Sequence, residues 1–526
     1  MRATAQPNLA SIGLVTLPEP IGQILSSQAA LIQSEVTSPS LRANSVSSLI
    51  TQENQLPGTE DWQLTNPAIR HEIEGYASLT SVNRGEQIRL YVNTTAPQYS
   101  IEIFRMGWYE GKGARRMTGP IVRTGIQQPK PAIDPVTGLI ECKWQDPYVL
   151  KIPDTSIIDW LSGFYLAKLT ASNSGKQSYI IFVIRDDDRP SDYLFQSSVT
   201  TYQAYNNWGN KSLYQWNSRG RKAFKVSFNR PYAPSPHRAG AYGVGAGEFL
   251  VNVQPYPRTA SAGWEYNMVR WLEREGNDVT YATNLDTHAN PRLLRSHAVF
   301  LSVGHDEYWS RQMRQNVETA RDAGVSLSFF SANTCYWQIR LEPSPLSQEL
   351  NRTIVAYKDW ARLDPLVQDR IRGNDDQATV RWREQPVNQP EAALIGVMYD
   401  TDPVLGDITI APDALAWLLA NTDLQPGSRL IGLLGYEVDR VTAASPANIK
   451  TIGHSPYQFH RQTRYSDMTF YQAKSGAIVF ATGSIQWSWG LDDFNAPQLR
   501  PSYLSAAAQQ LTRNVLARLK ESGRRA

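Results

Sequence analysis

The sequence is poor in cysteine and histidine. Its 526 residues include two cysteines, Cys142 and Cys335, and seven histidines. Two cysteines this far apart form neither a zinc-spacing motif nor a disulfide framework, so we expect two reduced thiols. No two histidines have ligand spacing, and the His-Glu-x-x-His helix of zinc hydrolases is absent. A histidine-rich zinc centre is therefore not predicted.

Long apolar runs and clusters of one charge are also missing. No stretch is long and apolar enough to span a membrane as a helix. The net charge is +3 and both signs are spread along the chain, so no nucleic-acid groove is predicted. Prolines at 7, 18 and 20 interrupt any export signal, which only an incorrectly assigned start codon could hide. The default expectation is a soluble, cytoplasmic protein, exported if the start is wrong.

Motifs of familiar enzymes are absent as well. There is no G-x-S-x-G elbow and no P-loop. A glutaminase-type cysteine would have to follow the apolar run that ends at Val303, but Gly304 and His305 stand there. Cys335 lies beyond the next such run, and we interpret it as a structural residue.

One apolar run is followed directly by three ionisable side chains. Residues 299–303 have the pattern of a buried strand in a parallel sheet, and His305, Asp306 and Glu307 come just after it. In open α/β sheets, ligands bind outside the carboxyl ends of the strands. His305 and Glu307 are therefore candidate functional residues, whereas Asp306 is also a candidate cap for a helix at 310–321.

The first half of the chain has the pattern of a β-sandwich. Short alternating runs, each bounded by turn residues, occur at 88–92, 99–104, 163–169 and 179–184. They predict an antiparallel sandwich of immunoglobulin-like type over residues 58–188. Residues 1–57 are rich in Ser, Gln, Thr and Pro, which predicts a poorly ordered N-terminal arm with room for one short helix.

From residue 189 onward, predicted strands alternate with predicted helices. The strands are at 192–198, 279–282, 299–303, 325–330 and 477–481, and the helices at 264–274, 310–321 and 504–519. This alternation predicts an α/β domain with a mostly parallel sheet over residues 189–526. Residues 340–475 are less regular, and we expect an insertion of loops and β-hairpins around the site.

Further polar residues follow the predicted strands. Asn333 comes after the strand at 325–330, and adjacent parallel strands would bring it within reach of His305. Tyrosines at 202–214 follow the strand at 192–198 and, with Glu307, offer oxygen donors that suit a hard cation. The segment 435–439 adds two acids that, taken alone, are typical of solvated surface charges.

Several of these stretches match one protein family. They are Thr-Tyr-Gln-Ala-Tyr-Asn-Asn-Trp-Gly at 201–209, Ser-Leu-Tyr at 212–214, Gly-His-Asp-Glu-Tyr-Trp at 304–309, the segment of Asn333, and the strands at 99–109 and 178–183. Through them the chain resembles the large (beta) subunit family of N,N-dimethylformamidase over roughly residues 60–520. The motifs are distinctive for the superfamily and less so for the amidase itself.

The resemblance implies a fold and a metal centre. The fold is an immunoglobulin-like sandwich followed by a glutamine-amidotransferase-like α/β domain. The centre is a mononuclear iron, expected to be ferric, held by two tyrosines and one glutamate. Glu307 matches the glutamate and Tyr214 one tyrosine, while Tyr202 is preferred for the other and Tyr205 is the alternative.

The resemblance also implies catalytic roles. His305 and Asn333 match polar residues that line the site, and Glu437 resembles a further catalytic carboxylate. Ferric iron with oxygen ligands is a Lewis acid, and the expected reaction is attack of metal-activated water on an amide carbonyl. His305 or Glu437 would move the proton, and Asn333 would donate a hydrogen bond to the oxyanion. Taken alone, an asparagine here could hold a turn, and each tyrosine could be a core aromatic.

Three functional interpretations follow. The first is a hydrolase of small amide C–N bonds, working with a small subunit as the characterised amidase does, or as a homo-oligomer. The second is a non-catalytic saccharide- or peptide-binding protein, which the many tryptophans favour, among them Trp208, Trp309, Trp337, Trp487 and Trp489. The third is a hydrolase of another substrate class, such as a sugar derivative.

Overall fold

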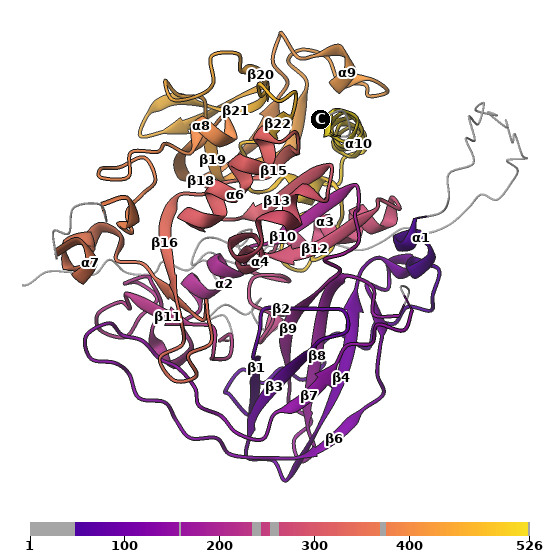
Figure 1. Cartoon of the computed structure of the whole chain (residues 1–526). Coiled ribbons are helices and arrows are strands. Elements are labelled where there is room, and N and C mark those ends of the chain that lie inside the picture. The colour runs from indigo at the N-terminus through magenta and orange to yellow at the C-terminus, as the bar shows by residue number, and fades with distance from the viewer. Residues whose placement is uncertain (1–47, 157–158, 234–242, 253–261, 369–374, 524–526) are drawn as a thin grey trace, which may run out of the picture. The chain divides into compact units, whose positions relative to one another are not determined.

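The computed structural model describes residues 48–156, 159–233, 243–252, 262–368 and 375–523 (Figure 1). All of them belong to one compact unit, Ser47–Ala526. Most of the predicted N-terminal arm lies outside the described residues. Its last part forms a short helix, α1 (Leu49–Asn54), with Ile50 and Glu53 buried. No helix in the described ranges is long and apolar enough to cross a membrane.

Two sheets in the N-terminal part share one hydrophobic core. The three-stranded sheet has β1 (Ile73–Ala77), β3 (Gln87–Thr94) and β7 (Tyr148–Lys151). The six-stranded sheet has β2 (Ser81–Asn83), β9 (Gln177–Arg185), β8 (Gly163–Ala171), β4 (Gln98–Met106), β5 (Ala114–Arg116) and β6 (Ile121–Thr124). Alternate side chains of a strand face opposite sides. Ile88 and Leu90 of β3 therefore pack with Ile101 and Ile103 of β4 in the core between the sheets.

A seven-stranded sheet forms the centre of the second part. Its order is β12 (Val279–Thr283), β10 (Tyr193–Ser197), β13 (Val299–His305), β15 (Ser326–Ala332), β22 (Ile478–Ala481), β21 (Gln462–Gln472) and β20 (Lys450–Phe459). The first five strands are parallel, β21 is antiparallel to β22, and β20 is antiparallel to β21. The protein is therefore of the mixed α/β class that the sequence predicts.

The chain order of these strands creates a switch point. From β10 the chain first continues to β12 on one side, and then returns to β13 on the other side of β10. Ligands of open α/β sheets bind outside the carboxyl ends of the strands at such a reversal. The segments that follow β10 and β13 carry the tyrosines and the His-Asp-Glu motif singled out in the sequence.

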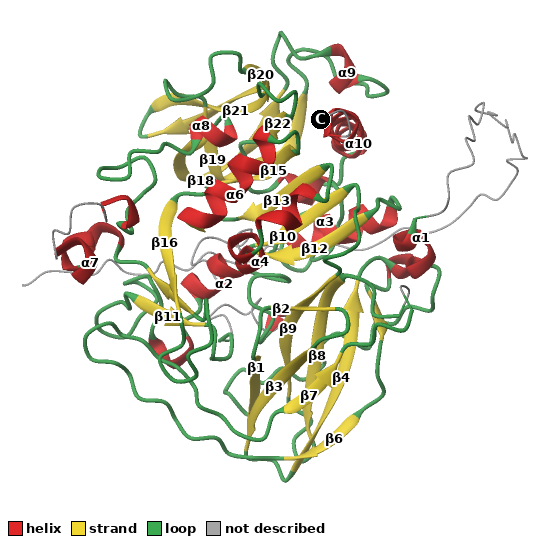
Figure 2. Ribbon diagram, viewed as in Figure 1, coloured by secondary structure: helices red, strands yellow, loops and turns green. Residues whose placement is uncertain are grey.

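Helices accompany the parallel strands (Figure 2). The helices of the second part include α2 (Val199–Tyr205), α3 (Glu265–Arg274), α4 (Asn284–Ala289), α5 (Pro291–Arg295), α6 (Arg311–Asp322) and α10 (Ala506–Gly523). Helices α3 and α10 pack against strands of the seven-stranded sheet. Helix α10 buries Leu511, Val515 and Leu519, which recur at helical spacing.

Two sequence expectations about the His-Asp-Glu motif are wrong in detail. Strand β13 does not stop at the glycine but continues through Gly304, at φ 69°, to His305. A Cβ on Gly304 would lie 2.7 Å from the Cβ of Trp264, so glycine permits close packing there. Asp306 is not the cap of α6, since Ser310 accepts the hydrogen bond from the Met313 N–H.

Asp306 instead has a structural role inside the sheet. Its buried carboxylate accepts hydrogen bonds from Gln196, Asn284 and Ser302 at 2.8–3.0 Å. These partners lie on β10, α4 and β13, so Asp306 ties together the segments on either side of the switch point. Both cysteines, Cys142 and Cys335, are free and buried.

The irregular segment contains hairpins, as expected, but it does not stand apart from the sheet. Strands β20 and β21 form a hairpin that extends the seven-stranded sheet beyond β22. A second hairpin joins β18 (Met398–Thr409) and β19 (Arg429–Arg440). The segment also contains the short helices α7 (Pro365–Gln368), α8 (Ala392–Ile395) and α9 (Ala416–Leu419). A four-stranded sheet joins β17 (Thr353–Val355) and β16 (Trp337–Glu342) to two strands from earlier in the chain, β11 (Lys225–Ser227) and β14 (Tyr308–Ser310).

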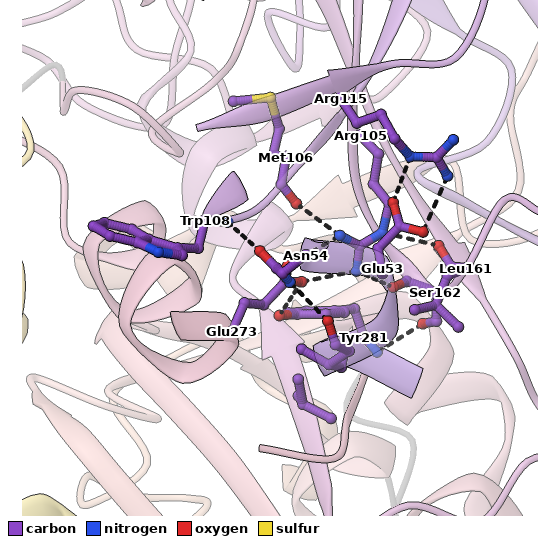
Figure 3. Close-up of polar contacts among 12 residues, drawn as sticks. Glu53, Asn54, Arg105, Met106, Trp108, Arg115, Leu161, Ser162, Glu273 and Tyr281 are labelled. Carbon is purple, nitrogen blue, oxygen red and sulfur yellow. Dashed lines mark hydrogen bonds and ion pairs between the residues drawn. The ribbon is translucent and has the colours of Figure 1, made fainter. Parts of the chain in front are cut away.

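A buried ion cluster connects the two parts (Figure 3). Arg105 on β4 donates two hydrogen bonds to Glu273 on α3, at 2.8 and 3.0 Å. Tyr281 on β12 and Asn54 on α1 donate to the same carboxylate, each at 3.0 Å. Beside them, Glu53 accepts hydrogen bonds from Arg115 and Tyr109 at 2.6–3.0 Å. The charges of this cluster are thus paired between elements of both parts of the chain.

Candidate functional site

The side-chain oxygens of three residues converge where β10 and β13 end. Tyr205 Oη lies 2.9 Å from Glu307 Oε2, and Tyr214 Oη lies 2.9–3.0 Å from both carboxylate oxygens of Glu307. The two tyrosine oxygens are 2.7 Å apart. All three residues line one pocket. We refer to these three residues as the oxygen triad.

Local structure explains why the triad forms. Tyr205 is the last residue of α2, which begins directly after β10. The backbone N–H of Glu307 donates to Thr201 Oγ1 on the same helix at 3.0 Å, which fixes the end of β13 against α2. The rings of Tyr205 and Tyr214 stack with centroids 4.3 Å apart. Ser212 accepts the Tyr214 N–H at 3.1 Å and so holds the turn that presents this tyrosine.

Tyr202, the sequence-based preference for the second tyrosine, lies elsewhere. Its hydroxyl is 3.5 Å from Ser197 Oγ, and its ring packs against Tyr232. Tyr202 and Tyr205 are three residues apart on α2, and only Tyr205 reaches Glu307. The geometry therefore replaces Tyr202 by the alternative, Tyr205, in the oxygen triad.

His305 lies between three buried carboxylates. Its Nε2 is 3.4 Å from Glu307 Oε2 and 3.3 Å from Glu437 Oε2, and its Nδ1 is 3.8 Å from Glu248 Oε2. None of these contacts is aligned as a hydrogen bond, so both ring nitrogens lack a hydrogen-bond partner. Burial alone would lower the pKa of His305, but Glu437, Glu248 and Glu307 raise it well above its usual value. The three carboxylates therefore favour the protonated form of the ring.

Glu437 and Asp439 are buried, which corrects the interpretation of these acids as solvated charges. They lie on β19 with 4% and 1% of their surface exposed. Burial raises the pKa of Glu437 to about 8, and His305 opposes the rise. Asp439 accepts the backbone N–H of Asn333 at 2.8 Å. Burial raises the pKa of Asp439 to about 7.

Asn333 reaches the site through the register of the parallel sheet. His305 of β13 pairs with Ala332 of β15, so Asn333 is the next residue along. Its φ of 54° is a left-handed conformation that asparagine tolerates better than most residues. Its side chain lines the same pocket, and its Oδ1 has no hydrogen-bond partner.

Glu248, Tyr308 and Lys358 are among the residues of the site that the sequence patterns did not indicate. Tyr308 Oη lies 2.6 Å from Tyr214 Oη, and its place directly after Glu307 in the matched motif was the available signal. Lys358 Nζ lies 3.4 Å from the centre of the Tyr214 ring. Burial lowers the pKa of Lys358 well below its usual value, against the opposing charge of Glu307. This lysine lies in the segment 340–475, where the sequence predicted only an irregular insertion.

The site opens into a pocket with a volume of about 450 Å³. Its lining comprises Tyr205, Tyr214, Trp216, Glu307, Asn333, Tyr336, Trp337, Tyr399, Asp402 and Glu437. Of the tryptophans expected to shape a pocket, only Trp337 does so. Trp309, Trp487 and Trp489 are fully buried, and Trp208 donates its indole N–H to Glu74.

The oxygen triad fits a hard metal ion. Oxygen ligands held about 2.0 Å from an octahedral cation lie roughly 2.8 Å apart, close to the observed separations. Among the described residues, no group of three or more His, Cys, Asp and Glu side chains is arranged to hold a metal ion. Burial and the charge of Glu307 raise the pKa of Tyr205 and Tyr214 well above the usual value. A bound cation reverses this effect and favours tyrosinate.

Two of the solved structures that match the chain are weak likenesses. The alkylpurine DNA glycosylase AlkC of Pseudomonas fluorescens, bound to DNA containing an abasic site analog, is 15% identical over 23% of this chain and 33% of its own, with a TM-score of 0.14. Murine CEACAM1b is 13% identical over 24% of this chain and 62% of its own, with a TM-score of 0.12. Both matches span less than two thirds of the other chain, and such TM-scores support no inference.

A family model gives a far more extensive match. No curated protein is similar enough to the chain to count as a relative. The model described as N,N-dimethylformamidase beta subunit-like, C-terminal, matches residues 100–500. The matched range includes the oxygen triad, His305, Asn333 and Glu437, and it spans most of the chain. The chain therefore belongs to the N,N-dimethylformamidase beta subunit-like family.

Proposed function

We propose that this protein is an iron-dependent hydrolase of small amide C–N bonds. The observation that carries the proposal is the convergence of the triad oxygens beside His305, a buried histidine without a hydrogen-bond partner. Unpaired polar groups in a buried site are expensive and are typical of functional sites. The family match, whose description names a formamidase subunit, supports an amide as the substrate.

The proposal includes a division of the chain into domains. Residues 58–188 would be the immunoglobulin-like sandwich, and the two sheets that share one core support this. Residues 189–526 would be the glutamine-amidotransferase-like domain, supported by the parallel strands and their switch point. We further propose that the chain works with a small subunit or as a homo-oligomer. Leu405 and Ile431 on the β18–β19 hairpin are 58% and 61% exposed, which supports an interface there.

Tyr205, Tyr214 and Glu307 would hold a mononuclear ferric ion. When bound, the ion would supply Lewis acidity toward the amide carbonyl and toward water. Tyr308, 2.6 Å from Tyr214 Oη, would fix the orientation of that ligand through its hydroxyl.

The surrounding residues would handle protons and the developing charge. His305, whose pKa its three carboxylate neighbours raise, would donate the proton at Nε2 to the departing amine nitrogen. Glu437, with a pKa of about 8, is suited to exchange a proton near neutral pH and would return it to His305 at 3.3 Å. Asn333 would orient its side-chain amide toward the substrate oxygen, where a donor stabilises the negative charge of the tetrahedral intermediate.

The first test is the iron content and visible spectrum of protein purified without chelator or added metal. We expect about one iron per chain and a tyrosinate-to-iron absorption band. Tyr205→Phe and Glu307→Gln should lose iron while remaining folded. Tyr202→Phe is the matched control, because it removes a hydroxyl from the same helix outside the oxygen triad.

The outcomes separate the alternatives. If Tyr202→Phe loses the iron and Tyr205→Phe retains it with an unchanged band, the ligand assignment is wrong. If the wild-type protein neither contains iron nor takes it up from ferric or ferrous salts, the iron-dependent hydrolase is rejected. The non-catalytic saccharide- or peptide-binding function would then be the better interpretation, to be tested with a glycan and peptide panel.

A further inference from the structure

The pocket beside the oxygen triad is acidic on its inner surface. Three carboxylates line it, those of Glu307, Asp402 and Glu437, and no lysine or arginine does so among the described residues. Glu307 and Glu437 are both engaged with His305. Asp402 is the remaining acid and is not required by the mechanism proposed above.

Asp402 differs from the acid two residues before it. Asp400, on the same strand β18, pairs with Arg440 at 2.9 Å and with Arg464 at 3.3 Å. Asp402 accepts a hydrogen bond from Tyr399 Oη at 2.6 Å and, within the described ranges, makes no ion pair. The strand therefore presents one neutralised carboxylate outside the pocket and one without a cationic partner in the pocket wall.

The aromatic rings of the pocket wall also differ in whether a cationic side chain already lies over them. The guanidinium groups of Arg381 and Arg383 already lie over the ring of Tyr336, at 5.5 and 5.2 Å from its centre. The rings of Trp216 and Tyr399 carry no such group from the part of the chain that the structure describes, although both line the pocket. Trp216 is 47% exposed. A cation over an aromatic face is attracted by the ring quadrupole.

The volume of the pocket adds a constraint on size. About 450 Å³ falls in the range of about 300–1,000 Å³ that is typical for ligands of drug size. A dialkylformamide would leave most of this space empty. The substrate therefore has room for a second group beyond the amide.

We infer that the substrate is an amide that carries a second, cationic amine or alkylammonium group, bound by Asp402 and the rings of Trp216 and Tyr399. The inference rests on the proposed function. Hydrolysis of such an amide consumes one water, breaks the C–N bond and yields a carboxylic acid and an amine. The cationic group takes no part in the bond changes and serves only in recognition.

The test uses two amides of matched shape, N-acetylethylenediamine and its uncharged isostere N-propylacetamide, with the iron-loaded protein. We expect kcat/KM to favour the cationic amide by about tenfold or more. In Asp402→Asn, which retains the size of the side chain, that ratio should fall about tenfold. Asp413→Asn is the matched control, because it removes the same charge from an exposed position outside the pocket.

A second variant and a binding measurement keep the test decisive. Trp216→Leu changes a half-exposed ring and no charge, and it should also lower the ratio. Calorimetric binding of the two amides to unmodified protein reports the preference even without turnover. Equal kcat/KM values for both amides, unaffected by Asp402→Asn, would overturn the inference while leaving the hydrolase intact. No turnover of either amide, with tighter binding of the cationic one, would reject the hydrolase and retain the recognition of a cation.

Discussion

The protein contains two buried charged clusters that are built on opposite principles. Around Arg105 and Glu273, every side-chain nitrogen and oxygen in Figure 3 has a hydrogen-bond partner or solvent access. Around His305, both ring nitrogens lack a partner, as do Glu437 Oε2 and both carboxylate oxygens of Glu248. Buried polar groups that are fully paired rigidify a fold, whereas unpaired ones are retained at a cost to stability. The first cluster thus holds the fold together, and the second is available for ligands and chemistry.

The largest effect is expected from removing the centre of the unpaired cluster. His305→Gln should lower kcat by about 10²- to 10⁴-fold on an amide substrate, because the proton donor to the leaving amine is lost. The variant should stay folded, but its thermal midpoint should fall, because Glu248, Glu307 and Glu437 lose their buried cationic neighbour at 3.3–3.8 Å. Steady-state kinetics and thermal melts on the same preparation check both expectations. A variant with full activity, or one that unfolds, would place His305 with the structural cluster instead.

The converse change is Glu273→Gln in the paired cluster. It removes the negative charge with which the buried Arg105 pairs. We therefore expect the free energy of unfolding to fall by about 3–5 kcal/mol. Denaturant titration measures this, with Glu437→Gln as the matched control from the other cluster. The contrast between the clusters fails if Glu437→Gln is destabilised as much as Glu273→Gln.

A third buried acid, Glu265 at the start of α3, is intermediate between the two clusters. Its Oε1 accepts the Ser198 N–H at 2.9 Å, whereas its Oε2 has no hydrogen-bond partner. Burial raises the pKa of Glu265 to about 7, against the hydrogen bonds that favour the carboxylate. A raised carboxyl pKa contributes stability that is present at low pH and is lost as the pH rises toward 7.

Glu265→Gln should therefore remove a pH-dependent loss of stability. Between about pH 5.5 and about pH 7.5, the wild type should lose about 2 kcal/mol more than the variant. Unfolding free energies at the two pH values give the difference. Parallel pH profiles for the two proteins would show that Glu265 ionises as it does in the unfolded chain.

The sequence predicted those parts of the site that lie close to strand ends. The apolar run before His305 and Glu307 located the end of β13, and the parallel register brought Asn333 beside it. It could not distinguish Tyr202 from Tyr205, because two tyrosines on adjacent turns of a short helix have the same local pattern.

Residues that reach the site through long-range strand pairing could not be predicted from local sequence patterns. Glu437 and Asp402 lie on the β18–β19 hairpin. The pairing of β18 with β19 and the position of the hairpin near β15 depend on tertiary packing. No local pattern indicated Lys358, because its partners, Tyr214 and Glu307, are far away in sequence. The order of strands and helices was easier to predict from the sequence, because buried parallel strands and amphipathic helices have strong periodic patterns.

Helix α3 gives the contrast between the clusters a practical consequence for protein engineering. Its last turn carries Glu273, and the residue before its first turn, Trp264, packs edge-on against His305 with ring centres 6.1 Å apart. Truncation of the chain to the parallel-sheet part would remove Arg105, the partner of Glu273. It would thereby destabilise helix α3, which also supports His305. A minimal enzyme made by truncation would therefore have to redesign that helix, although none of the removed residues lines the pocket.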